Sequence, residues 1–125
     1  MKKIITTDNA PKAVGPYSQA VMVNDTLYAS GQIAINPTTG LMVDSSIELQ
    51  TRQVMSNLKS LLEASGLTFD NVVKTTVYLK NMDDFSVVNS IYAESFKEDA
   101  PARSCVAVAS LPKNALIEVD LIAVK

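Results

Sequence analysis

The residues best suited to chemistry lie near the C-terminal end of the chain. Arg103 and Cys105 stand two apart in a segment typical of a strand, and Glu118 lies in the next predicted strand. A guanidinium holds a carboxylate through two parallel hydrogen bonds. A carboxylate between apolar neighbours tends to have a raised pKa, which suits a general base. These residue types predict a site for a small anionic ligand.

The predicted hairpin brings these groups together in one register only. A turn centred between Pro112 and Lys113 places Arg103, Cys105 and Glu118 on one face of the sheet. A shift of the centre by half a residue would break this match. A site built on this register therefore requires the guanidinium and the carboxylate to lie on the same side of the sheet.

Each residue also has a purely structural interpretation. Arg103 could pair with Glu118 or Asp120 across the hairpin, and the spacing alone favours that pairing. Glu118 could be a solvated residue on an open sheet face. Cys105 fits a small buried residue better than a nucleophile, because no neighbour in the sequence clearly activates its thiol.

Weaker signals come from three other segments. Tyr17 follows a Gly-Pro turn that displays its ring, although such tyrosines are usually packing residues. Ser30 and Gly31 lie in a predicted strand, where a glycine marks a bulge or a close approach to a ligand or another strand. Asn89 lies beside the apolar stripe of a predicted helix.

The composition narrows the chemistry further. The chain has 125 residues, 47% of them hydrophobic and 19% charged, which predicts one domain spanning residues 1–125. It has no histidine and one cysteine, which argues against a zinc site, a disulfide within the chain and a histidine-activated nucleophile. No metal site is therefore expected. The net charge of −2, with 11 scattered basic residues, argues against a broad nucleic-acid surface.

The order of predicted elements indicates an α+β fold with a mostly antiparallel sheet backed by two helices. A capping box of Ser45 and Glu48 begins the first helix and Gly66 ends it; Asp83 or Asp84 caps the second, whose apolar face reaches Phe96. A tight turn at Asn24 and Asp25 joins the first two predicted strands into a hairpin. The predicted strands are 21–23, 26–30, 72–80, 104–109 and 116–124.

The last predicted strand is apolar on both faces, although two helices can cover only one face of the sheet. The exposed face would be a large apolar patch. We expect other subunits to cover it; the alternative is that the N-terminal segment folds over it. The N-terminus lacks the apolar run of a signal peptide and the single cysteine suits a reducing compartment, so a cytoplasmic protein is expected.

Several segments together resemble the Rid family, the reactive intermediate deaminases also called the YjgF family. The similarity runs nearly end to end, and its most specific part is the arginine strand with the spaced glutamate. The matching stretches are Gly15-Pro16-Tyr17-Ser18-Gln19-Ala20, Ser30-Gly31-Gln32-Ile33, Asn89-Ser90-Ile91-Tyr92, Pro101-Ala102-Arg103-Ser104-Cys105-Val106, Leu111-Pro112-Lys113 and Ile117-Glu118-Val119.

This resemblance implies a homotrimer of chorismate-mutase-like α+β subunits, with inward-facing sheets and active sites in the clefts between subunits. It also implies hydrolysis of 2-imino acids, such as 2-iminobutanoate and 2-iminopropanoate, to 2-oxo acids and ammonia without a cofactor. The imines come from pyridoxal-phosphate dehydratases that act on threonine and serine, which implies a functional link to those enzymes.

Carried over to this sequence, the resemblance assigns roles to single residues. Arg103 would hold the substrate carboxylate and Glu118 would position and deprotonate water. Ala100 stands where many relatives carry Phe or Tyr, which implies a looser pocket wall or a wider substrate range. The residues that would shape the pocket are Tyr17, Ser30, Gly31, Asn89 and Cys105.

Other functions remain open at this point. The trimer could be a non-catalytic regulatory protein that senses 2-oxo acids or related metabolites. A ribonuclease or translation-inhibitor activity, reported for some relatives, is disfavoured by the low positive charge. A chaperone-like role is a further alternative.

Overall fold

The computed structural model describes residues 1–125 and contains six strands, two α-helices and three short 3₁₀ turns. The strands are β1 (Lys2–Ile5), β2 (Ala20–Val23), β3 (Thr26–Gln32), β4 (Val72–Leu79), β5 (Ala102–Ala107) and β6 (Ile117–Val124). The helices are α1 (Ile47–Ala64) and α2 (Phe85–Tyr92), and the turns are η1 (Phe69–Asn71), η2 (Met82–Asp84) and η3 (Pro112–Asn114).

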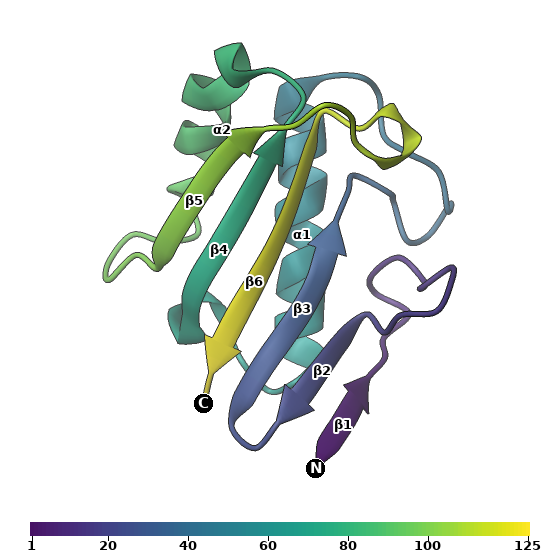
Figure 1. Cartoon of the computed structure of the whole chain (residues 1–125), viewed down its shortest axis with the longest axis vertical. Helices are drawn as coiled ribbons and strands as arrows, with labels where there is room; N and C mark the ends of the chain where they lie inside the picture. Colours follow the sequence, from purple (N-terminus) through teal and green to yellow (C-terminus); the bar gives the residue numbers. More distant parts are fainter.

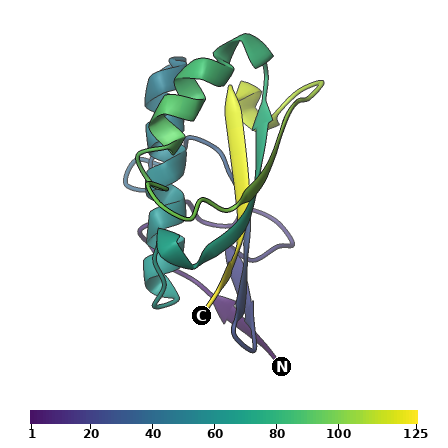
Figure 2. The same ribbon diagram turned by 90° about the vertical axis from the view of Figure 1, so that its left-hand side faces the viewer.

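The strands form one mixed sheet in the order β1-β2-β3-β6-β4-β5 (Figure 1). All neighbouring pairs are antiparallel except β4 and β5, which are parallel. Seen edge-on, both helices lie on one side of the sheet (Figure 2). The predicted α+β class, with a mostly antiparallel sheet and helices on one face, is confirmed.

Local sequence explains the first hairpin and the limits of α1. Asn24 adopts φ 52° at the tight turn between β2 and β3, as the hairpin prediction required. The N-cap of α1 is Ser46, whose side chain accepts a hydrogen bond from Leu49 N, so the predicted cap at Ser45 is wrong by one residue. Gly66 ends the helix with φ 75°, as predicted.

The second helix begins differently from the prediction. Asn81 caps η2 through a hydrogen bond from Asp83 N, while Asp84 makes no side-chain capping bond to α2. The helix ends at Tyr92, so Phe96 lies beyond it. The apolar stripe nevertheless continues in space, because the Phe96 ring packs against Tyr92 with centroids 4.7 Å apart.

The predicted hairpin between β5 and β6 is wrong. β5 pairs only with β4, where Thr75 aligns with Arg103, and β6 lies on the other side of β4, where Tyr78 aligns with Glu118. The cause is the crossover through α2: a strand, a helix and a second strand joined in this way form a parallel pair. β6 then fills the gap between β3 and β4 and holds the sheet together.

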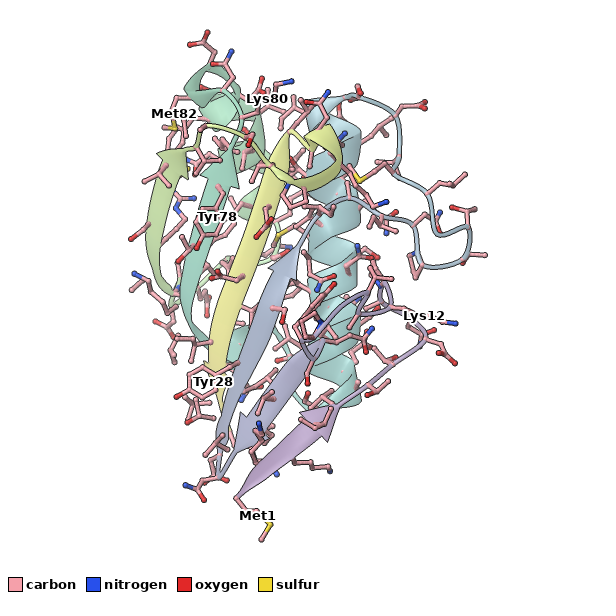
Figure 3. The ribbon with its side chains drawn as sticks, turned by 45° about the vertical axis from the view of Figure 1, so that its right-hand side comes forward. Met1, Lys12, Tyr28, Tyr78, Lys80 and Met82 are labelled. Atoms are coloured by element: carbon pink, nitrogen blue, oxygen red, sulfur yellow. The ribbon has the colours of Figure 1, made fainter.

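The hydrophobic core lies between the sheet and the helices. It contains 21 buried residues, and the helix-facing side chains of β6 (Ile117, Val119, Leu121 and Ala123) are all part of it. The opposite face stays open: Tyr28 is 49% exposed, Val106 46% and Val124 37%. Figure 3 shows Tyr28 and Tyr78 on this open face.

The N-terminal segment does not cover the open face. β1 instead extends the sheet at its edge by pairing with β2 (Figure 1). The alternative expectation for this segment is therefore wrong. Neither helix is both long and apolar enough to span a bilayer.

Candidate functional site

Arg103 lies on the edge strand β5 and points toward α2. Its Nη1 donates a hydrogen bond of 2.7 Å to Asn89 Oδ1 on the helix. Its guanidinium carbon lies 4.8 Å from the centroid of the Tyr92 ring and 5.4 Å from that of Phe85. A helix side chain and two aromatic faces therefore hold the guanidinium in place.

The guanidinium of Arg103 has no acidic partner within the chain. The two ion pairs of the structure both belong to Arg52, with Glu48 and Glu94. The structural interpretation that paired Arg103 with Glu118 or Asp120 is wrong, because β4 separates the arginine strand from β6. A positive charge that is positioned but unpaired is suited to an anionic ligand.

An open cleft of about 370 Å³ adjoins this arginine. Its lining includes Asn89, Tyr92, Phe96, Ala100 and Pro101, so Ala100 does form part of the wall beside Arg103. The cleft combines one cation with aromatic and small apolar groups. Such a lining suits a carboxylate that carries a short apolar chain.

Cys105 follows Arg103 on the same side of the sheet and is partly buried against the core. Burial raises the pKa of its thiol, and the charge of Arg103 opposes this rise without cancelling it. The thiol is therefore protonated near neutral pH and is a poor nucleophile. The structure supports the interpretation of Cys105 as a small residue lining the strand.

Glu118 points to the open face of the sheet. Its carboxylate makes no hydrogen bond or ion pair within the chain. Burial raises the pKa of Glu118 above its ordinary value, and the charge of Asp120 raises it further. A partly buried carboxylate without a partner is suited to hold and deprotonate a water molecule.

Gly31 makes room for this carboxylate. β3 has a bulge between Ala29 and Gln32, and a Cβ added at Gly31 would collide with the Glu118 carboxylate. The close approach predicted at this glycine is thus to a side chain of the neighbouring strand. Any larger residue at position 31 would displace the acid.

Tyr17 and Glu118 line the same cleft, which has a volume of about 350 Å³. Tyr17 is 52% exposed, and its hydroxyl accepts a hydrogen bond of 3.3 Å from Val14 N. Ser30 Oγ donates to Ser18 O at 2.6 Å, so this hydroxyl holds the Tyr17 loop in place. Lys12, on the same loop, stands at the side of the molecule (Figure 3).

The candidate residues thus form two clusters. The arginine cluster comprises Arg103, Asn89 and Cys105; the glutamate cluster comprises Tyr17, Ser30, Gly31 and Glu118. Arg103 faces the helices and Glu118 faces away from them. The prediction that they share a face is wrong, and a site in which one chain supplies both groups to the same ligand is excluded.

Comparison with known proteins places the whole chain in one family. A family model described as Endoribonuclease L-PSP matches residues 7–125. A crystal structure from Yersinia pestis, described as a protein of unknown function of the conserved Rid protein family, has a TM-score of 0.98 and 52% identity, with 100% of each chain covered. The chain belongs to the Rid family.

Two Rid relatives carry functional names. The 2-iminobutanoate/2-iminopropanoate deaminase of Homo sapiens is 44% identical over 125 residues, which are 100% of this chain and 91% of the relative. A Lactococcus lactis protein named for a regulator, AldR, is 54% identical over 121 residues, which are 97% of this chain and 96% of the relative.

Sequence reasoning missed the residues that support the two Rid clusters. In the sequence, Phe85 and Tyr92 fit an apolar helix face, yet the Arg103 guanidinium also lies over both of their rings. Gln19 is 5% exposed and binds the backbone of Thr7, Ala10 and Pro11, which fixes the loop that leads to Tyr17. A glutamine directly before an apolar strand was the available signal for this role.

Proposed function

We propose that this Rid protein hydrolyses 2-imino acids to 2-oxo acids and ammonia. The observation that carries the proposal is the guanidinium of Arg103, which is held by Asn89 and two aromatic rings but lacks an acidic partner. The name of the human relative supports this activity. The substrates would be the imines that form when pyridoxal-phosphate dehydratases release enamines from threonine or serine.

The proposed site is shared between copies of the chain in a homotrimer with a chorismate-mutase-like arrangement. One copy supplies the arginine cluster and its neighbour supplies the glutamate cluster. Two features support this arrangement. Arg103 lies on an edge strand, where a second copy can reach it, and Tyr28, Val106 and Val124 expose apolar surface around the face that carries Glu118.

The reaction follows from the two charged groups. Arg103 holds the substrate carboxylate and so aligns the adjacent imine carbon. Glu118 accepts a proton from water while the water oxygen bonds to the carbon of the protonated imine, which gives a carbinolamine. That proton passes to the nitrogen, the C–N bond breaks as Glu118 takes the hydroxyl proton and the C=O bond forms, and ammonia leaves and carries this second proton away as ammonium.

The energetic demand on these groups is modest. An iminium carbon is already electrophilic, and imines hydrolyse in water without a catalyst. A positioned general base contributes about 10²–10⁴-fold, and alignment by the carboxylate anchor adds to this. A chain without histidine can therefore supply the chemistry.

The experiment is a coupled assay. An amino-acid oxidase produces imines from several L-amino acids, the protein is added, and the decay of the imine and the appearance of ammonia are followed. The proposal predicts faster decay at catalytic protein concentration. Unchanged decay at every protein concentration would contradict it.

A second candidate is a ligand-binding regulator, which the name of the Lactococcus relative favours. Saturable binding of 2-oxobutanoate without any acceleration of imine decay would support that function instead. The family description also names an endoribonuclease. The net charge of −2 disfavours endoribonuclease activity. Cleavage of RNA by the purified protein would show that this activity is present despite the charge.

A further inference from the structure

The Tyr92 ring, over which the Arg103 guanidinium lies, is held by a buried pair of hydroxyl groups. The Tyr92 hydroxyl and Thr75 Oγ1 are 2.7 Å apart and share a hydrogen bond. Tyr92 is 7% exposed and Thr75 is 1% exposed, so water does not replace this bond. Thr75 stands directly beside Arg103 in the pairing of β4 with β5.

The ring of Tyr92 is restrained from several sides. Phe96 packs on it with centroids 4.7 Å apart, and Phe69 meets Phe96 edge-on at 5.2 Å. The hydroxyl bond to Thr75 fixes the remaining end of the ring. Burial raises the pKa of the Tyr92 phenol, which keeps this group neutral and able to donate.

This restraint matters because arginine has a long side chain. Rotamer entropy opposes the fixing of a free arginine. A guanidinium that is held before the ligand arrives avoids much of this cost at the moment of binding. Asn89 accepts a hydrogen bond from one nitrogen of Arg103, and the guanidinium carbon lies over the Tyr92 ring at 4.8 Å from its centroid.

We propose that Thr75 and Tyr92 are positioning residues, whose hydrogen bond sets the orientation of the Arg103 guanidinium for a carboxylate. The inference rests on the proposed function, because it assigns the carboxylate to Arg103. It adds a role for the two hydroxyl groups, which bond each other and not the ligand, although the Tyr92 ring lines the cleft. Loss of either hydroxyl therefore changes ligand binding only through the orientation of the Arg103 guanidinium.

The test uses variants that change the hydroxyl pair and little else. Thr75→Val and Tyr92→Phe each remove one hydroxyl and preserve shape, and the double variant removes both. Thr75→Ser keeps the hydroxyl but loses a buried methyl group. The matched control is Thr51→Val, since Thr51 is also 1% exposed and donates to Ile47 O at 2.7 Å, but lies in α1.

Binding of 2-oxobutanoate is measured by calorimetry, and the melting temperature is recorded for each variant. We expect the Kd to rise about fivefold in Thr75→Val and in Tyr92→Phe, because part of the rotamer entropy of Arg103 is then lost only when the ligand binds. The double variant should show the same rise rather than the product of two. Thr75→Ser should melt at a lower temperature but recover the affinity, and Thr51→Val should lose stability alone.

A second readout does not require a ligand. In nitrogen NMR of the free protein, slow rotation of the Arg103 guanidinium is expected in the wild type and faster rotation in Thr75→Val. A wild-type guanidinium that rotates freely would overturn the positioning role, whether or not the protein is a deaminase. Wild-type affinity in both hydroxyl variants, despite lower melting temperatures, would overturn it as well.

The two proposals can fail separately. If the wild type binds 2-oxobutanoate but does not accelerate imine decay, the deaminase proposal fails and the binding series still decides the role of Thr75 and Tyr92. If the wild type binds no 2-oxo acid, the carboxylate assignment fails, and with it the positioning role.

Discussion

The Arg103 guanidinium and the Glu118 carboxylate lie on opposite faces of one sheet, separated by strand β4. A single chain therefore cannot bring both groups to one ligand, and the proposed site takes them from two copies. It also explains why neither charge is neutralised by the other. Each group is left available for a ligand or for water.

Replacement of Arg103 by alanine should remove the carboxylate anchor. We expect imine turnover to fall at least about 100-fold, because the reacting carbon loses its alignment. The oligomer should stay intact, as sedimentation can show. The matched control is Arg52→Ala, which breaks exposed ion pairs with Glu48 and Glu94 and should leave turnover unchanged. Full activity of the Arg103 variant would contradict its role.

Replacement of Glu118 by glutamine should remove the base while preserving the shape of the side chain. We expect kcat to fall by about 10²–10⁴-fold, with the Kd for 2-oxobutanoate little changed. Steady-state kinetics and calorimetry measure the two effects separately. A rise in KM alone, at unchanged kcat, would mean that Glu118 binds substrate rather than activating water.

The pH dependence of the reaction should report on Glu118. The base must be ionised, so kcat/KM should rise with pH through the pKa of Glu118, which burial and Asp120 raise above its ordinary value. Asp120→Asn removes the second of these causes and should move the acid limb of the profile to lower pH. An unmoved or upward-shifted limb would argue that another group titrates.

The same raised pKa has a consequence for stability with a definite sign. The folded state binds the proton of Glu118 more tightly than the unfolded state does, so the free energy of unfolding decreases as pH rises between the two pKa values. Glu118→Gln should remove this decrease. The variant should therefore gain stability relative to the wild type at neutral pH, and this gain should vanish in acid, as denaturant titrations can test.

Gly31 should be intolerant of a side chain because Glu118 occupies the space. Gly31→Ala should cost about 1 kcal/mol of unfolding free energy from overpacking and should lower kcat by displacing the base. The double variant Gly31→Ala with Glu118→Ala should recover the free energy of unfolding that Gly31→Ala loses, but not the activity. Equal destabilisation in the single and double variants would show that the strain at position 31 has another source.

The sequence was sufficient to predict the hairpin at Asn24, the end of α1 at Gly66 and the strand that becomes β4, because each depends on local turn or propensity signals. The open apolar face could also be predicted, since Ile122 and Val124 alternate with buried residues. These features need no knowledge of the partner strands.

The arrangement of the site could not be predicted in the same way. Strands that follow each other in the sequence are often neighbours in the sheet, whereas here the α2 crossover places β5 outside β4, away from β6. The strand-helix-strand order before Arg103 was the signal for a parallel pair. The support from Tyr92 and Thr75 was hidden because an aromatic helix stripe and a threonine-rich strand are usual core features.

The shared site can be tested most directly by mixing two inactive chains. Arg103→Ala and Glu118→Ala chains are unfolded together in equal amounts and refolded into mixed oligomers, with each variant refolded alone as the control. A site between copies predicts recovery of about one quarter of the wild-type activity, because half of the chains supply each intact group. Mixed oligomers that form but remain as inactive as the separate variants would contradict the account.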